Sequence, residues 1–330
     1  MPSPQFPRIA TIPILPALPA HLAFTQGNIW HVRPVNGLDA NTGRSPAQAF
    51  KTLAKALAKA TANQNDIVLL YAESNTAANT TDYQSAKLDW NKDMVHLIGV
   101  NAGGPFAQRS RIAFASTFVT AANLFTLSAN GCYIANVEFW AGVASALPTG
   151  CVSVTGQRNK IENCHIAGMG TGVGLMDSAG AYSLQLSGAQ ENLFVDCTIG
   201  QDTVTLGAAV NAVMYFAAGA VRNVFRGCRF LLYTNHATNC QFLRAAAGSM
   251  DRYQIFKDCD FINAIDSGST PLTEAFTVVS GGSPAGGILL KNCSIQGAID
   301  WNATDSGNVT ALGGSITSAT EGLATDVTRA

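Results

Sequence analysis

Acidic side chains that recur at corresponding positions along the chain are the residues best placed to do chemistry. Asp196 and Asp258 occupy the same position in two copies of a sequence repeat, and Asp260 follows closely. Two carboxyl groups held about 6.5–9.5 Å apart can act as acid and base in an inverting glycoside hydrolase. The competing interpretation is structural, since Asp also suits a tight bend of the chain. Other charged residues near this position in the repeats would accompany the carboxylates: Glu162, Arg226, Arg229, Lys257 and Lys291.

Cysteine and histidine are poorly placed for metal or redox chemistry. No Cys-x-x-Cys pair is present, and the histidines (His21, His31, His96, His165 and His236) show no ligand-like spacing. We therefore expect no metal and no cofactor. Five cysteines recur once per repeat and are expected to form one aligned column in a hydrophobic core: Cys164, Cys197, Cys228, Cys259 and Cys293.

An internal repeat supplies the elements that must position these residues. Each copy reads apolar, any residue, then Asn, Asp or Gly, then Cys, any residue, apolar. The cysteine position, Val137 in the first copy, recurs at intervals of 27, 33, 31, 31 and 34 residues. The residue before it belongs to the three types that best tolerate positive φ, which predicts one left-handed bend residue per coil and a ladder of stacked amides. These residues are Asn136, Asn163, Asp196, Gly227, Asp258 and Asn292.

Short strands with period-two alternation, joined by such bends, predict an all-β fold. We expect a right-handed parallel β-helix (a solenoid) whose coils stack about 4.8 Å apart, so that Asp196 and Asp258 lie about 10 Å apart. Ser45 and Pro46 predict an amphipathic helix that ends near Asn63 and caps the first coil. Strands are expected over 66–71 and 94–99. The predicted boundaries are an extended Pro-rich arm at 1–27, an opening strand and capping helix at 28–65, coils at 66–311, and a C-terminal tail or last irregular coil at 312–330.

Composition excludes several classes of protein. The chain has 330 residues, of which 47% are hydrophobic and only 12% charged, and its formal net charge is −1. A nucleic-acid-binding protein would need a basic surface, a disordered chain would have few apolar residues, and a coiled coil would need many Glu and Lys. No apolar run is long enough to span a bilayer. We expect neither a nucleic acid nor a membrane as a partner.

The N-terminal arm combines prolines with apolar residues. Proline pre-sets φ, so that laying such a segment along a partner costs little ordering entropy. The alternative is a loose terminus without a partner. We interpret the arm as a docking strap, with a partner-binding set of Pro4, Pro7, Ile12, Ile14, Leu15 and Leu18.

The segment from Trp30 to Leu53 resembles a known family. It contains Gly37-Leu-Asp39-Ala-Asn41-Thr-Gly43, then Ser45-Pro46 and Ala49-Phe50-Lys-Thr52-Leu53. This run is similar to the opening segment of pectin-lyase-like right-handed β-helix proteins, and the resemblance extends through the coils to about residue 300. The family includes lyases, hydrolases, adhesins and bacteriophage virion proteins, and its phage members are commonly homotrimers.

The resemblance, the low charge and the arm together favour a non-enzymatic structural protein of a tailed bacteriophage virion. We expect a capsid decoration or minor capsid protein, assembled in the host cytoplasm as a homotrimer and docked by its arm onto the major capsid protein or another virion protein. The alternative is a tail spike that binds or cleaves a host surface polysaccharide as a glycoside hydrolase or lyase. In that case the catalytic candidates are Asp196, Asp258 and Asp260. A secreted adhesin is a third interpretation, disfavoured because we recognise no signal peptide.

Overall fold

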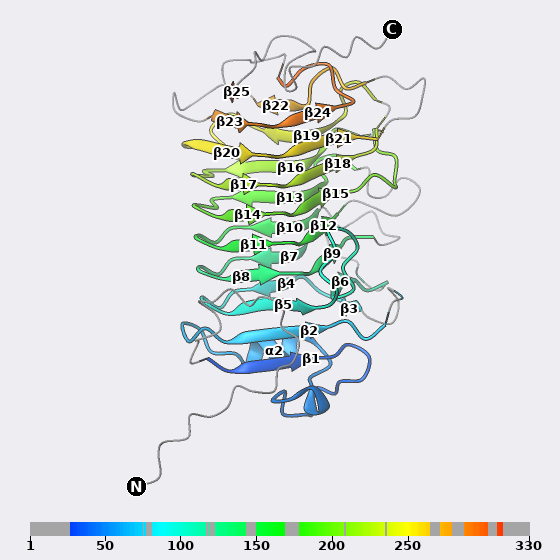
Figure 1. Ribbon diagram of the computed structural model, residues 1–330, viewed down its shortest axis with the longest axis vertical. Helices are drawn as coiled ribbons and strands as arrows, with labels where there is room; N and C mark the ends of the chain where they lie inside the picture. Colours follow the sequence, from blue (N-terminus) through cyan, green and yellow to red (C-terminus); the bar gives the residue numbers. More distant parts are fainter. Residues whose placement is uncertain are drawn as a thin grey trace.

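The computed structural model shows a rod of stacked β coils with very little helix (Figure 1). It describes residues 27–312 except 75, 77–80, 117, 119–122, 143–149, 169–177, 208, 235, 265–270, 279–286 and 303–308. The predicted arm and tail therefore lie outside the described residues, apart from Gly27 and Leu312. Within the described part, no helix is long and apolar enough to cross a membrane.

Three parallel sheets, here called A, B and C, run the length of the rod. Sheet A is built from β1 (Ile29–Val32), β2 (Ile67–Tyr71), β5 (His96–Val100), β8 (Tyr133–Ala135), β11 (Lys160–Glu162), β14 (Leu193–Val195), β17 (Val224–Arg226), β20 (Tyr253–Lys257), β23 (Gly287–Lys291) and β25 (Val309–Leu312). Sheet B is built from β3 (Thr81–Gln84), β6 (Arg111–Phe114), β9 (Glu138–Trp140), β12 (His165–Ala167), β15 (Thr198–Gly200), β18 (Arg229–Leu232), β21 (Asp260–Asn263) and β24 (Ser294–Gln296). Sheet C is built from β4 (Leu88–Trp90), β7 (Asn123–Leu127), β10 (Gly150–Val154), β13 (Tyr182–Ser187), β16 (Asn211–Ala218), β19 (Cys240–Ala245) and β22 (Phe276–Val278). From β2 to β24 the strands belong to sheets A, B and C in turn, which is the architecture of a parallel β-helix.

The bend between sheets A and B holds the residue type that the repeat indicates. Asn136, Asn163, Asp196, Gly227, Asp258 and Asn292 have φ of 58°, 48°, 51°, 64°, 54° and 51°. The amide ladder is present in two places, because Asn163 Nδ2 donates to Asn136 Oδ1 at 2.8 Å and Asn292 Nδ2 donates to Asp258 Oδ1 at 3.1 Å. It is interrupted at Gly227, which has no side chain. A Cβ there would lie 2.3 Å from Oδ1 of Asp196.

A second left-handed column, which the repeat did not predict, lies where sheet C passes into sheet A. Met94, Arg158, Glu191 and Arg222 have φ of 55°, 54°, 56° and 50°. The expectation of one such residue per coil was therefore wrong for these coils. The residue type at this second bend varies from coil to coil, so a repeat of Asn, Asp or Gly does not predict it.

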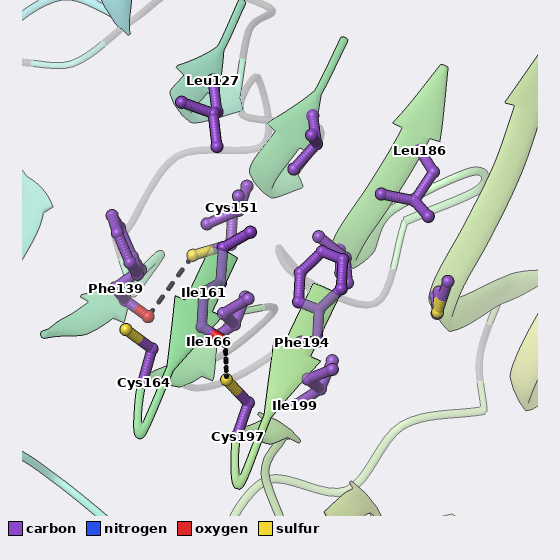
Figure 2. Packing of buried hydrophobic residues seen from close by; sticks show 14 of the residues in the cluster. Leu127, Phe139, Cys151, Ile161, Cys164, Ile166, Leu186, Phe194, Cys197 and Ile199 are labelled. Atoms are coloured by element: carbon purple, nitrogen blue, oxygen red, sulfur yellow. Dashed lines mark hydrogen bonds between the residues drawn. The ribbon is translucent and has the colours of Figure 1, made fainter. Parts of the chain in front are cut away.

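The bend cysteines are buried in the interior of the rod (Figure 2). Their thiols donate to backbone carbonyls; Cys197 Sγ, for example, lies 3.5 Å from the oxygen of Ile161. Phenylalanines of successive coils stack beside them, with ring centroids of Phe194 and Phe225 4.5 Å apart and those of Phe225 and Phe256 4.6 Å apart. The core is therefore a continuous column along the rod axis.

The capping segment differs from the single helix expected from Ser45 to about Asn63. A 3₁₀ helix, η1 (Pro46–Gln48), precedes the α-helix α2 (Leu53–Lys59), and Thr52 accepts the amide of Lys55 as the N-cap of α2. The chain between them is extended because Phe50 is fully buried and exchanges backbone hydrogen bonds with β1. Tertiary pairing therefore overrides the helical periodicity at this point.

Candidate functional site

Each candidate catalytic carboxylate has a structural role, either at a left-handed bend or in a hydrogen bond to the next coil. Asp196 and Asp258 are the left-handed bend residues described above, and the carboxylate of Asp258 accepts from Asn292. Asp260 lies at the start of β21 and accepts from the hydroxyl of Ser294 on the next coil. Bend geometry and coil-to-coil hydrogen bonding therefore account for the positions of all three.

The other charged candidates spread over two faces. Glu162 on sheet A accepts from Tyr133 Oη at 2.6 Å and pairs with Lys160 Nζ at 2.7 Å. Arg229 on sheet B lies with its guanidinium 5.8 Å from the ring centre of Phe106. Arg226, Lys257 and Lys291 form an in-register column on sheet A.

Histidine and cysteine are held in structural contacts. His165 is buried, with Nδ1 accepting the amide of Ala107 at 3.0 Å and Nε2 3.1 Å from the oxygen of Gly200. Burial lowers the pKa of His165 to about 4, so that the ring is neutral at physiological pH. Burial also raises the pKa of the thiols of Cys151, Cys197 and Cys228. No group of three or more His, Cys, Asp or Glu residues in the described ranges is arranged to hold a metal ion.

Of the three tryptophans in the coils, two are inside the rod. Trp90 and Trp301 are 0% and 1% exposed. Trp140 is half-buried, and the guanidinium of Arg111 lies over it at 4.8 Å from the ring centre.

The outer face of sheet C carries a groove near the C-terminal half of the rod. Gln185, Tyr215, Arg244 and Thr277 occupy one in-register column of four successive coils. Beside them the groove has a volume of about 520 Å³. Its other lining residues are Ala179, Gly180, Val210, Phe216, Ala217, Ala245 and Ala246. Small residues next to a Tyr–Arg pair leave room for a ligand against the sheet.

Arg244 is the cation of this groove, and backbone carbonyls hold its guanidinium in place. Nε donates to the oxygen of Asn211 at 3.0 Å, and Nη2 donates to the oxygens of Thr238 and Asn239 at 2.9 and 3.3 Å. Within the described residues, no carboxylate lies within ion-pairing distance of Arg244. The neighbouring Tyr215 has a raised pKa because of burial, which the charge of Arg244 partly opposes. The guanidinium is thus pre-positioned with its charge uncompensated by a described ion pair.

A buried polar cluster adjoins Arg244 and Thr277. Gln241 Nε2 donates to Glu274 Oε1 at 3.1 Å. The hydroxyl of Thr277 lies 2.5 Å from Gln241 Oε1 and 2.8 Å from Glu274 Oε1. Gln241 and Glu274 are 2% and 7% exposed. This cluster fixes the hydroxyl of Thr277 at the margin of the groove.

The sequence repeat did not indicate this groove. The repeat is defined by the residue types at the bend between sheets A and B, and the groove residues lie on the strands of sheet C. Tyr215, Arg244 and Thr277 differ in chemistry and share only their spacing, which is close to one repeat. Aligning the strands that precede each bend would have placed them in one column.

The outer face of sheet A carries a different feature, an apolar column. Leu193, Val224, Ile255 and Leu289 pair in register on four successive coils, and all four are only half-buried. We call this set the upper apolar column. It presents a flat strip of aliphatic side chains to the outside of the rod.

Comparisons with known proteins agree on the fold. No protein-family model matches the chain, and no curated protein matches it. Among solved structures, pectate lyase Pel9A is similar with a TM-score of 0.55 and 14% identity, covering 90% of this chain and 79% of the other. A rhamnogalacturonan lyase has a TM-score of 0.50 and 15% identity over 82% and 68% of the two chains. Pectin methylesterase PemA from Erwinia chrysanthemi has a TM-score of 0.50 and 14% identity over 86% and 80%. At these identities the likeness shows the right-handed parallel β-helix fold and nothing further.

Proposed function

We propose that the protein is a non-enzymatic structural component of a tailed bacteriophage virion, a capsid decoration or minor capsid protein. It acts as a homotrimer of rods, and its N-terminal arm docks it onto a capsid protein. The upper apolar column is the observation that carries this proposal. Four aliphatic side chains aligned on a flat outer face provide a surface that gains free energy when a second rod covers it.

The roles of the carboxylates support a structural protein. Asp196 and Asp258 occupy bend positions with positive φ, which Asp tolerates. Asp260 accepts a hydrogen bond from Ser294 of the next coil. The neutral composition adds to this support, because few charges must lose water when rods pack side by side.

Analytical ultracentrifugation and particle binding test the proposal together. The full-length protein is expected to sediment as a trimer, and Val224→Asp with Ile255→Asp is expected to sediment as a folded monomer. The matched control is Arg226→Asp with Lys257→Asp, which changes the neighbouring column and leaves the aliphatic strip intact. The protein added to virions that lack it is expected to sediment with them. A wild-type monomer that does not bind virions would contradict the proposal.

A second candidate function is recognition of an acidic polysaccharide in the groove of sheet C. Arg244 offers a guanidinium for a carboxylate, Tyr215 offers an aromatic face for a sugar ring, and Thr277 offers a hydroxyl. The names of the fold neighbours, pectate lyase and rhamnogalacturonan lyase among them, support a carbohydrate ligand only loosely. This function corresponds to a tail spike that binds, or also cleaves, a host surface polysaccharide.

Binding and cleavage are measured separately for this second candidate. Polygalacturonate and host surface polysaccharide are titrated into wild type and Arg244→Gln, with Arg226→Gln as a matched change of an exposed arginine on another face. Binding in the groove predicts at least a tenfold weaker association for Arg244→Gln alone. New reducing or unsaturated ends that disappear in Asp196→Asn or Asp258→Asn would establish catalysis and contradict the non-enzymatic proposal.

A further inference from the structure

The loop between β5 and β6, residues 101–109, crosses the bends and strands of later coils. Near its start, Asn101 Nδ2 donates to the oxygen of Asn136 at 2.7 Å, at the bend that follows β8. Two coils further along the rod, the hydroxyl of Thr198 on β15 donates to the oxygen of Pro105 at 2.9 Å. The loop therefore also crosses the coil between these two, and we call it the crossing loop.

His165 on β12, in that middle coil, is the side chain that the crossing loop contacts most directly. Its Nδ1 accepts the amide of Ala107 at 3.0 Å, and its Nε2 lies 3.1 Å from the oxygen of Gly200. Because an amide N–H can only donate, Nδ1 carries no proton, and the proton of the ring is on Nε2, which donates to the carbonyl. Phe106 meets the ring edge-on, with ring centroids 6.0 Å apart. The contacts of the loop thus hold the imidazole in one neutral tautomer.

Hydrogen bonds rather than apolar packing hold the crossing loop to the rod. Of its nine residues only Gln108 is buried, and the side-chain amide of Gln108 donates to the oxygen of Asn163 at 2.7 Å. Phe106 is 47% exposed. Ala107 has φ of 48°, a left-handed conformation that is strained for alanine. A loop with little buried apolar surface and one strained residue opens at a lower free energy than the coils beneath it.

Charged groups of both signs surround His165. Burial lowers the pKa of His165 to about 4, which the carbonyl of Gly200 and the charge of Asp202 oppose and the charge of Arg111 reinforces. The titratable or charged groups on the elements around it are Glu138 and Arg111 on the two preceding coils, Arg229 on β18, Asp202 after β15, and Arg109 of the crossing loop.

We propose that acid releases the crossing loop, because protonation of His165 at Nδ1 breaks the bond to Ala107 and frees the loop from the outer face of sheet B. The added proton occupies the lone pair that accepted the amide, so that two N–H groups then point at each other. Once the loop has left, the ring regains contact with water and its pKa returns toward 6.5. The ratio of released to bound loop should therefore rise on the order of 100-fold between pH 7.5 and pH 4.

Release changes the surface of sheet B and does not depend on the virion role proposed above. It would uncover the groups that the bound loop contacts, which are His165, Thr198 and the bend at Asn163. The rod would thus present a more polar, positively charged surface at this place in acid than at neutral pH.

Site-resolved hydrogen exchange, corrected for the intrinsic rate at each pH, measures the release. The protection of the Ala107 amide is expected to fall on the order of 100-fold from pH 7.5 to pH 4 and to stay below that of the Leu193 amide in sheet A. His165→Asn keeps a side-chain oxygen for the amide and does not titrate, so its protection should change by less than about threefold.

Two results of the exchange experiment would overturn the proposal. An equal fall in protection in wild type and His165→Asn would assign the pH dependence to another group. Equal protection of the Ala107 and Leu193 amides at every pH would show that the whole rod unfolds and that the loop does not open by itself.

Titration of the His165 ring by nitrogen NMR gives an independent readout, also if the Asn side chain fails to hold the loop. Wild type is expected to carry its ring proton on Nε2 at pH 7.5 and to titrate near pH 4. Ala107→Pro removes the amide and cannot adopt positive φ, so the midpoint should rise toward 6.5. The matched change Ala107→Gly keeps the amide and the positive φ, so the midpoint should stay near 4. A proton on Nδ1 at pH 7.5 in wild type, or a midpoint that Ala107→Pro does not move, would overturn the proposal.

Discussion

The carboxyl group of Asp82 is the most consequential buried acid in the described structure. It lies on β3, is 4% exposed, and accepts the amide of Leu53 at the start of α2 through Oδ2 at 3.0 Å. Burial raises the pKa of Asp82 to about 6, although the bond from Leu53 opposes the shift. The group thus links the capping helix to sheet B and leaves the stability of this cap sensitive to pH.

Asp82 is expected to make the protein less stable as pH rises. Its pKa is higher in the folded protein than in the unfolded chain, so the folded state binds more protons between about pH 4 and pH 6. The free energy of unfolding should fall through this window by up to about 3 kcal/mol from this group. Asp82→Asn keeps an oxygen for the Leu53 amide and should remove this loss. The measurement is urea unfolding of both proteins from pH 4 to pH 7.5.

The difference in free energy of unfolding between wild type and Asp82→Asn is the informative quantity. His165 also changes the stability of both proteins with pH, in the opposite direction to Asp82. Its pKa is lowered to about 4, so its contribution to stability is lost as pH falls from about 6.5 toward 4. Subtracting the curves cancels this contribution. A difference that does not grow between pH 4 and pH 6 would contradict the assignment to Asp82.

The eight cysteines are expected to be inert in the folded protein. All are buried and free, and burial raises the pKa of several of them, to about 12 for Cys132. The thiolate is the reactive form, so both access and ionisation are suppressed. Counting thiols with an aromatic disulfide reagent should give none in buffer and eight in denaturant. Rapid reaction of native Cys164 or Cys293 would show that the end of the column is open.

At the scale of the elements, a buried amide ladder holds the turns between sheets C and A. Asn159, Asn192, Asn223 and Gln254 lie on successive coils, and each side-chain oxygen accepts the backbone amide of the coil before, as in Asn159 N to Asn192 Oδ1 at 2.9 Å. Each amide nitrogen donates to a backbone carbonyl, as Asn192 Nδ2 does to the oxygen of Gly156 at 3.0 Å. The ladder satisfies buried polar groups that the turn would otherwise leave without partners.

Asn192→Ala is expected to destabilise the coils strongly. It leaves the amide of Asn159 and the oxygen of Gly156 unpaired inside the protein, which should cost about 3 kcal/mol. The matched control is Asn292→Gly, at an exposed bend where glycine keeps the positive φ, with a cost below about 1 kcal/mol. Equilibrium unfolding in urea gives both values. Similar losses for the two variants would contradict the role of the buried ladder.

The coils could be predicted from the sequence because the bend repeats in residue type. Positive φ favours Asn, Asp or Gly, and all six bends between sheets A and B hold one of these three types. The buried corner beside the bend holds Cys in five copies and Val137 in the first, so the pattern can be recognised in each copy. The turn containing Arg158 and Glu191 could not be predicted, because its left-handed residues share no type. The groove residues Tyr215 and Arg244 were missed for a similar reason, since an outward position on a strand restricts chemistry little.

At the scale of the whole molecule, sheets A and C offer different surfaces to the outside of the rod. Sheet A carries the upper apolar column, which suits contact with protein. Sheet C carries the groove with Arg244, which suits an anionic ligand. Both faces run parallel to the rod axis (Figure 1). A trimer formed through sheet A would leave the three grooves accessible to the outside.

Electron cryomicroscopy of the virion, with and without the protein, tests the central claim most directly. The account predicts rod-shaped densities in groups of three on the particle, attached at their N-terminal ends and absent from particles that lack the protein. Particles purified from host cells that produce the protein, but without such density, would contradict the assignment as a virion structural protein.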